Sequence, residues 1–384
     1  MKLKKLAAGA IGAVLALGLT ACANENANST ATTTGSNPTS GAATTGAPAA
    51  AGGLVGISMP TTTLERWNND GKNLVDKLKG MGYTTDLEYA DNKPELQVSQ
   101  LENMINADAK VLVIAAIDGT VLGPVLQTAA DAGIKVIAYD RLINGTKNVD
   151  YYATFDNEKV GTLQGQFIET QLGLKDGKGP FNLEPFAGSP DDNNAKFFFK
   201  GAWDVLLPYV QSGKLVVPSG KSPASVDEWQ NIGIQAWKTE TAQAEMQNRL
   251  NSYYSGGAKV DVVLSPNDSL ALGIEQALQG AGYQVGTDWP VITGQDGDLA
   301  NVKNMLAGLQ SMTVWKDTRE LGDQAAKMVD QIMKGTTVDV NNNTYDNGVK
   351  VVPAYLLTPK VVTKDTVESL LVGSGFYKKD QLGL

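Results

Sequence analysis

Polar side chains follow the apolar runs of this sequence at the points where those runs end. Asp140 and Arg141 come directly after the apolar run 134–139. Other runs end in the same way, in "FAGSPDDNN", "VVLSPND", "VITGQD" and "SMTVWKD", and contribute Asp191, Asp192, Asn193, Asn194, Asn267, Asp268, Gln295, Asp296 and Lys316. One polar end would mean little, but a set made only of Asp, Asn, Gln, Arg and Lys predicts a polar pocket.

These residue types suit a polyhydroxylated ligand. Carboxylates, amides and guanidinium groups can grip neighbouring hydroxyls with paired hydrogen bonds. A sugar ring also presents a C–H face that packs flat on an aromatic ring. Trp67, which follows Arg66 in "LERW", and Trp237 in "AWKTETAQ" are the candidates for such a ring. A place in the core is the alternative for both tryptophans.

The charges of the candidate pocket cancel. Two acidic and two basic residues balance: Asp140, Asp296, Arg141 and Lys316. A neutral ligand can therefore be enclosed without leaving an uncompensated buried charge. A solvated surface or a helix cap is the alternative for any one carboxylate, and Asp156 and Asp268 both precede helix-like segments. For Asp268 a cap and a ligand contact are equally compatible with the sequence.

The apolar runs have the pattern of parallel strands that are covered on both faces. They lack polar alternation and are separated by amphipathic segments of helical period. The runs fall into two groups, 54–59, 110–117 and 134–139, then 179–189, 259–266 and 289–296. We therefore predict an α/β fold with two doubly wound parallel-sheet lobes. In such sheets ligands bind beyond the carboxyl ends of the strands, where the polar residues occur.

Composition narrows the function further. The chain has 384 residues, a net charge of −9 and no histidine. The acidic balance argues against nucleic-acid binding, which needs Lys and Arg to neutralise phosphates. The lack of histidine excludes His-based catalytic triads, His-ligated metal sites and His proton shuttles. We expect no metal and no cofactor.

The N-terminus resembles a bacterial lipoprotein signal. Lys2, Lys4 and Lys5 precede an uncharged apolar run at 6–19, which is too short to span a membrane and fits a signal peptide over 1–21. The run ends in "LTAC", where Cys22 is the only cysteine of the chain. We expect cleavage before Cys22 and lipidation of its sulfur, with an ordinary signal peptide as the alternative. An exported chain with one cysteine has no internal disulfide, so its fold must depend on its core.

A linker follows the predicted lipidation site. Residues 22–53 are rich in Ala, Thr, Ser, Gly and Asn and show no apolar periodicity. Such a segment should be a disordered tether. We therefore expect an exported protein that is anchored by lipid to the outer face of the cytoplasmic membrane and does not enter it otherwise.

From Leu54 to the C-terminus the sequence resembles the periplasmic sugar-binding proteins of carbohydrate ABC importers, in particular their multiple-sugar-binding and xylose-binding members. The likeness rests on "LERW", "GIKVIAYDRLI", "VDYYATFDNEKVGTLQ", "GSPDDNNA", "ITGQDGDLANVK" and "NGVKVVPAYLLTPKVVTKD". The resemblance implies a type I solute-binding fold with a sugar in the cleft between two lobes. The implied sugar contacts are Arg66, Trp67, Asp140, Arg141, Asn194, Trp237, Asn267, Asp296 and Lys316. Asn267 matches the xylose-binding pattern, whereas the multiple-sugar pattern has an aromatic residue there.

The resemblance also implies lobe boundaries. The N-terminal lobe would comprise 54–156 with 316–345, and the C-terminal lobe 157–315 with 346–384. The three crossings between the lobes would lie near 155–158, 314–316 and 345–350. Tyr151, Tyr152 and Phe155 are expected to pack at the hinge and not to line the cleft.

The function implied is binding without catalysis. The protein would act as a monomer that captures an aldose of xylose, glucose or galactose type and delivers it to an ABC transporter permease. A sugar sensor that presents its ligand to a membrane receptor kinase is the alternative. A surface glycoside hydrolase, an alternative of another class, would need two carboxylates placed across the scissile bond. A sugar-responsive repressor is rejected by the signal peptide and by the lack of an N-terminal helix-turn-helix.

Overall fold

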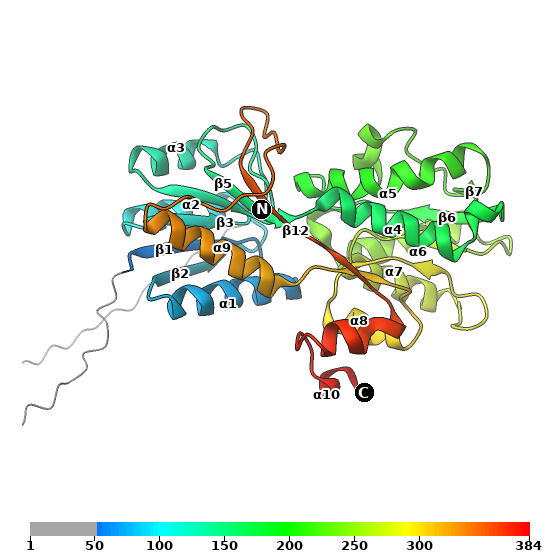
Figure 1. Ribbon diagram of the computed structural model, residues 1–384. Coiled ribbons are helices and arrows are strands. Elements are labelled where there is room, and N and C mark those ends of the chain that lie inside the picture. The colour runs from blue at the N-terminus through cyan, green and yellow to red at the C-terminus, as the bar shows by residue number, and fades with distance from the viewer. Residues whose placement is uncertain (1–51) are drawn as a thin grey trace, which may run out of the picture. The chain divides into compact units, whose positions relative to one another are not determined.

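The computed structural model describes residues 52–384, which form two α/β lobes (Figure 1). The predicted signal peptide, Cys22 and nearly all of the predicted linker lie outside the described residues. Within residues 52–384, no helix is both long and apolar enough to cross a membrane.

The first lobe is built on one parallel sheet of six strands, in the order β12-β5-β4-β3-β1-β2. In chain order the strands are β1 (Leu54–Met59), β2 (Thr84–Tyr89), β3 (Val111–Ile114), β4 (Lys135–Tyr139), β5 (Tyr151–Phe155) and β12 (Ala354–Leu357). Its helices are α1 (Glu65–Gly80), α2 (Pro94–Asn106), α3 (Gly123–Asp131) and α9 (Thr318–Met333).

Both faces of this sheet are buried. Helices α1 and α9 form a core with one face, to which Val111 and Val113 of β3 point. Helices α2 and α3 form a core with the other face, to which Leu112 and Ile114 point. A strand that is buried on both sides needs apolar residues at every position, which explains the apolar runs without alternation.

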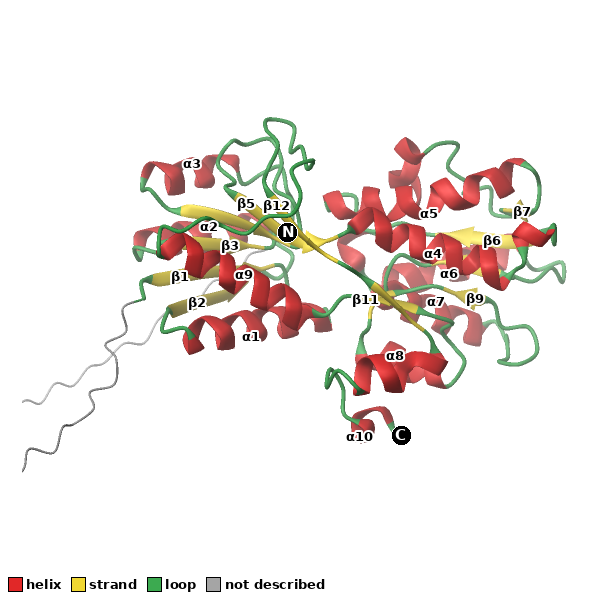
Figure 2. Cartoon of the chain, viewed as in Figure 1, coloured by secondary structure: helices red, strands yellow, loops and turns green. Residues whose placement is uncertain are grey.

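The second lobe has a four-stranded parallel sheet in the order β7-β6-β8-β9 and a separate three-stranded sheet (Figure 2). The four strands are β6 (Phe181–Pro185), β7 (Leu215–Val216), β8 (Val262–Leu264) and β9 (Val291–Ile292). The covering helices are α4 (Asn157–Gln171), α5 (Asn193–Gln211), α6 (Thr239–Tyr253) and α7 (Asp268–Gly280), and all four contribute to one core.

The smaller sheet lies beside α8 and the C-terminal segment. Its strands are β10 (Gln295–Asp296), β11 (Thr313–Trp315) and β13 (Lys360–Val362), with β13 antiparallel to β11. Residues from α8 (Leu299–Leu306), from β11 and from the segment ending in α10 (Lys379–Leu382) share a small core. Short helical turns lie at Leu174–Asp176, Val226–Ile232, Gln235–Trp237, Lys364–Thr366 and Glu368–Val372.

The third crossing between the lobes is not where it was predicted. Strand β12 pairs in parallel with β5, so residues 346–357 belong to the first lobe and not to the second. The segment before β12 is held to this lobe as well, because the Asn347 side chain donates to the carbonyl oxygens of Ile143 and Thr146. The chain therefore passes from β12 in the first lobe to β13 in the second, and the prediction of a crossing at 345–350 is wrong. The polar sequence "NNNTYDNG" has the composition of a linker, but it forms a loop within one lobe.

Candidate ligand-binding site

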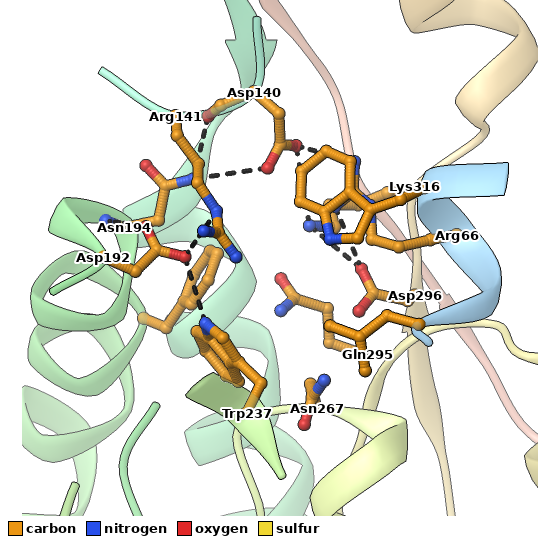
Figure 3. Close-up of a pocket in the computed structure, with 13 residues that line it drawn as sticks. Arg66, Asp140, Arg141, Asp192, Asn194, Trp237, Asn267, Gln295, Asp296 and Lys316 are labelled. Atoms are coloured by element: carbon orange, nitrogen blue, oxygen red, sulfur yellow. Dashed lines mark hydrogen bonds and ion pairs between the residues drawn. The ribbon is translucent and has the colours of Figure 1, made fainter. Parts of the chain in front are cut away.

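A cavity lies between residues of the two lobes, and its empty space, counted together with open solvent, is about 290 Å³ (Figure 3). All nine side chains predicted to contact a ligand line it. Four further residues line it, Leu64, Asp192, Phe198 and Gln295. The sequence placed Asp192 and Gln295 among the polar strand ends but not among the expected sugar contacts, and it did not indicate Leu64 or Phe198.

The ends of the strands bring these residues together. Asp140 and Arg141 follow β4 of the first lobe, Asp296 ends β10 and Lys316 follows β11. Arg66 and Trp67 lie in the first turn of α1. Loops at the carboxyl ends of parallel strands can present polar groups without interrupting the sheet, which is why this edge carries the site.

Arg66 is the centre of a buried ion-pair network. Its Nη2 lies 2.9 Å from Asp140 Oδ2 and 2.9 Å from Asp70 Oδ2, while its Nη1 lies 3.3 Å from Asp296 Oδ1. Lys316 Nζ lies 3.0 Å from Asp296 Oδ1 and 3.9 Å from Asp140 Oδ2. Because Arg66 and Asp140 belong to the first lobe and Asp296 to the second, this network joins the lobes through the cavity wall.

Burial and the neighbouring charged side chains act in opposite directions on the pKa values of these carboxyl groups. Burial raises the pKa of Asp140, but Arg66, Lys316 and Arg141 outweigh it and hold this pKa below its usual value. For Asp70 burial prevails over Arg66 and raises the pKa to about 6. Asp140 therefore remains an ionised hydrogen-bond acceptor at neutral pH.

A second network lies around Asp192. Arg141 Nε lies 2.9 Å from Asp192 Oδ2, and Trp237 Nε1 donates to the same oxygen at 3.2 Å. The other carboxylate oxygen, Oδ1, accepts from the backbone N–H of Asn194 at 2.9 Å, as an N-cap of α5. Asp192 thus fixes one basic and one aromatic side chain of the cavity. The sequence showed its place after a strand end, and its position as the helix cap of α5 is the further signal that could have marked it as a site residue.

The Trp67 ring is packed against both arginines of the cavity. The guanidinium carbons of Arg66 and Arg141 lie 4.3 and 5.1 Å from its centroid. Such cation–π contacts stabilise buried arginines and hold the ring in place. Trp67 is therefore packed as core while it also lines the cavity, and its contact with a ligand stays a prediction.

Three cavity residues have a strained backbone. Asp140, Trp237 and Asp296 have φ values of 59°, 55° and 102°, which residues other than glycine rarely adopt. Conformations of this kind cost about 1–3 kcal/mol each and are concentrated at functional sites. Trp237 also requires Gly188 beside it, because a Cβ at that position would lie 2.0 Å from the indole ring.

Three buried polar atoms of the cavity have no hydrogen-bond partner within the described part of the chain: Trp67 Nε1, Arg141 Nε and Gln295 Oε1. Arg141 Nε is still ion-paired with Asp192, which leaves Trp67 Nε1, a donor, and Gln295 Oε1, an acceptor. A buried polar group without a partner costs about 1–3 kcal/mol. A hydroxyl group can both donate and accept, so a polyhydroxylated ligand has the chemistry to satisfy both atoms.

The predicted helix caps are partly correct. Asp156 accepts from the Lys159 N–H at 3.0 Å and caps α4, as expected. The cap of α7 is Asn267, whose Oδ1 accepts from the Leu270 N–H, and not Asp268. Asp268 is neither a cap nor a cavity residue, since its carboxylate accepts from the backbone N–H groups of 297 and 298. It therefore shapes the loop that carries Asp296.

Residues 55–337 match the family described as the periplasmic binding protein domain. The chain belongs to this family. It is 56% identical over 332 residues to the multiple sugar-binding periplasmic receptor ChvE of Rhizobium radiobacter, which covers 86% of this chain and 92% of ChvE. It is 38% identical over 328 residues to the D-xylose-binding periplasmic protein of Escherichia coli, which covers 85% and 92% of the two chains.

Solved structures show the same fold for this periplasmic binding protein. An ABC transporter solute-binding protein from Clostridium phytofermentans with bound β-D-glucose has a TM-score of 0.82 and 53% identity, and the match covers 86% of this chain and 99% of that one. A carbohydrate transporter solute-binding protein from Chloroflexus aurantiacus with D-glucose has a TM-score of 0.76 and 33% identity, over 86% and 98%. The predicted family and α/β fold are confirmed.

Proposed function

We propose that this chain binds one aldose in the cavity between its lobes and delivers it to an ABC transporter permease. The observation that carries the proposal is the cavity itself. It is small, its charged side chains balance, and it holds an unpaired donor and an unpaired acceptor from different lobes, Trp67 Nε1 and Gln295 Oε1.

Each lining group has a role in this proposal. Asp140 and Asp296 accept hydrogen bonds from neighbouring hydroxyls, and Arg66, Arg141 and Lys316 donate to ring and hydroxyl oxygens. Trp67 and Trp237 supply apolar faces for the C–H sides of the sugar. Because residues of both lobes contact the ligand, the sugar binds the closed form more tightly than the open one, and this difference drives closure.

The relatives support the class of ligand. One is called a multiple sugar-binding receptor, another a D-xylose-binding protein, and two solved structures contain glucose. We therefore propose glucose, galactose and xylose as the first ligands to test. The side chain of Asn267 is the place where the two sequence patterns differ, so it is the first position to examine for sugar preference.

Thermal unfolding with and without each of five aldoses tests sugar binding directly: glucose, galactose, xylose, arabinose and ribose. A ligand at 100 times its dissociation constant stabilises the folded state by about 2.7 kcal/mol. We expect a rise in Tm with one or more sugars, lost in Asp296→Ala and kept in the control Asp323→Ala, whose carboxylate pairs with Lys77 on the surface. No shift with any sugar would contradict the proposal.

Lipid anchoring at Cys22 is a separate part of the proposal, supported by the sequence 1–22. Expression of the full-length chain and its Cys22→Ser variant in a bacterium, followed by membrane fractionation, tests it. We expect the unaltered protein in the membrane fraction and the variant outside it. Equal distribution of the two would show that Cys22 is not the anchor.

A further inference from the structure

The main-chain oxygen of Asp140 lies within hydrogen-bond distance of three donors that come from both lobes. Tyr152 Oη and Thr154 Oγ1, on β5 of the first lobe, lie at 2.7 and 2.9 Å. Asn194 Nδ2, at the start of α5 in the second lobe, lies at 2.8 Å. Tyr152 and Thr154 thus bind this oxygen within the first lobe, and Asn194 reaches it from the second.

The amide of Asn194 contacts the first lobe through both of its ends. While its Nδ2 donates to the Asp140 oxygen, its Oδ1 lies 3.2 Å from Tyr152 Oη. Asn157 Nδ2 donates to the same Oδ1 at 3.0 Å. This contact fixes the orientation of the Asn194 amide, so that its NH₂ group faces Asp140 and not the hinge.

The Tyr152 hydroxyl has one proton and two acceptors within reach, and the acceptors belong to different lobes. They are Asp140 O in its own lobe and Asn194 Oδ1 in the other. Burial raises the pKa of Tyr152 well above its usual value, so the hydroxyl keeps this proton. With the lobes together, Asn194 donates to that oxygen, and the Tyr152 proton can turn to Asn194 Oδ1.

We propose that Tyr152 and Thr154 are positioning residues that hold the Asp140 carbonyl as the docking point for the Asn194 amide when the lobes close. This inference rests on the proposed function and deepens it. Neither hydroxyl lines the cavity, so neither is expected to touch the sugar. Both residues are fully buried, and Tyr152 packs edge-on against Tyr345. They lie on β5, directly before the chain crosses to α4 of the second lobe.

This role has a distinctive consequence for affinity. A residue that acts on closure changes the fraction of binding-competent protein, and the apparent affinity for every ligand falls by the same factor. A residue that contacts one sugar hydroxyl changes the affinity only for the sugars that have it. Position 140 is also sensitive, because its φ of 59° must be held by such contacts for the carboxylate to face the cavity.

The test compares four variants of the full-length chain. Tyr152→Phe and Thr154→Val remove one hydroxyl each at nearly constant shape, and Thr154→Ser keeps the hydroxyl. Tyr151→Phe is the matched control, because its side chain points to the opposite face of β5. Isothermal titration with glucose, galactose and xylose gives the affinities, and small-angle X-ray scattering over a series of glucose concentrations gives the degree of closure.

We expect Tyr152→Phe and Thr154→Val to weaken binding of all three sugars by the same factor, about 3- to 10-fold, which is the usual effect of one hydrogen bond. Thr154→Ser and Tyr151→Phe should stay within about twofold of the unaltered protein, on the same scale. Both hydroxyl-deletion variants should need more sugar to reach the closed radius of gyration.

Three results would overturn the inference: unchanged affinity in both deletion variants, a loss confined to one sugar, or a Thr154→Ser variant as weak as Thr154→Val. If unfolding of the sugar-free protein shows that Tyr152→Phe does not fold, the comparison of Thr154→Val with Thr154→Ser tests the inference instead. An unaltered protein that binds none of the sugars would instead contradict the proposed function.

Discussion

Buried ion pairs occur in two regions of this molecule, and they differ in what they leave unsatisfied. In the second lobe, Arg249 Nη1 lies 3.1 Å from Glu184 Oε2 and also donates to a backbone carbonyl at 2.8 Å. The other Glu184 oxygen accepts from Tyr254 at 2.7 Å, and Ser219 donates to Oε2 at 2.6 Å. Both Glu184 oxygens and the Arg249 Nε and Nη1 atoms have partners in the described chain, and neither residue has a buried atom without a hydrogen-bond partner there.

The cavity between the lobes differs in three respects. Its charged groups come from both lobes, three of its residues have positive φ, and Trp67 Nε1 and Gln295 Oε1 lack partners among residues 52–384. A buried ion pair alone is therefore weak evidence for a binding site. Unfilled hydrogen-bonding capacity, backbone strain and location between two lobes together distinguish the cavity from the second-lobe pair.

The largest effect on stability should come from the second-lobe pair. Arg249→Met leaves the Glu184 carboxylate buried without its cation, which typically costs about 3–5 kcal/mol of the free energy of unfolding. Chemical denaturation of the sugar-free protein measures it. Lys196→Met, which breaks an exposed pair with Asp227, is the control and should change stability by less than about 1 kcal/mol. A loss below about 1 kcal/mol in Arg249→Met would show that the folded state does not depend on Arg249 to compensate the buried charge of Glu184.

The cavity should respond in the opposite way, with affinity changed more than stability. Asp140→Asn keeps the shape but removes a charged acceptor, and Arg66 still has Asp70 and Asp296 as partners. Hydrogen bonds to charged groups are worth about 1.5–3 kcal/mol, so we expect sugar binding to weaken about 10- to 150-fold. Titration calorimetry measures this, with sugar-free denaturation as its control. A variant that loses stability but keeps its affinity would place Asp140 with the structural pairs.

The features of the fold and the cavity that depend on short segments of sequence could be predicted, whereas those that depend on backbone angles or on distant strand pairing could not. Apolar runs without alternation predicted parallel strands, and the polar residues at their ends predicted the cavity. Gln295 was named among the polar strand ends but not among the expected sugar contacts. Neighbouring residues in a strand normally face opposite sides, so Gln295 and Asp296 would not both be expected to face the cavity. The φ of 102° at Asp296 breaks this alternation and lets both side chains line the cavity, and such a backbone angle cannot be read from sequence.

Asp70 and the third crossing show two other limits. Asp70 lies four residues after Arg66, a spacing that places both on one helix face, so its ion pair could have been predicted. The crossing after β12 could not, because a polar loop within a lobe and a linker between lobes have the same composition. Only the pairing of β12 with β5 decides between them.

A third kind of buried charge, a carboxyl without a cation, should make stability depend on pH. Burial raises the pKa of Glu275 to about 8 from its usual value of 4.5, and Asn304 donates to one of its oxygens. Between these pH values the folded state binds more protons than the unfolded state, so stability falls as the pH rises.

Glu275→Gln cannot ionise and should remove that part of the pH dependence. We expect the variant to match the unaltered protein near pH 4.5 and to be more stable at pH 8, by an amount that grows by up to about 1.4 kcal/mol per pH unit. Denaturation across this pH range measures it. Parallel stability curves for the two proteins would contradict the assignment.

The smallest effect should come from substitution of Gln295. It should leave stability unchanged or slightly higher but should lower the affinity for sugar. Gln295→Met removes the unpartnered Oε1 at similar length, while Pro266 O keeps its hydrogen bond from Gln164 Nε2 at 3.1 Å. The sugar-free protein should be as stable as the unaltered one or slightly more stable, because no unpaired acceptor is buried. Sugar affinity should fall about 3- to 10-fold, because one ligand hydrogen bond is lost.

Gln324→Met is the matched control for this last comparison. Gln324 Nε2 is also buried without a partner in the described chain, but the residue lies on α9 and does not line the cavity. Its substitution should leave affinity unchanged and should not lower stability. If both variants kept full affinity, the unpaired atom of Gln295 would be a cost of packing like that of Gln324. A selective loss in Gln295→Met would show that the cavity keeps an acceptor unpaired because the ligand pairs with it.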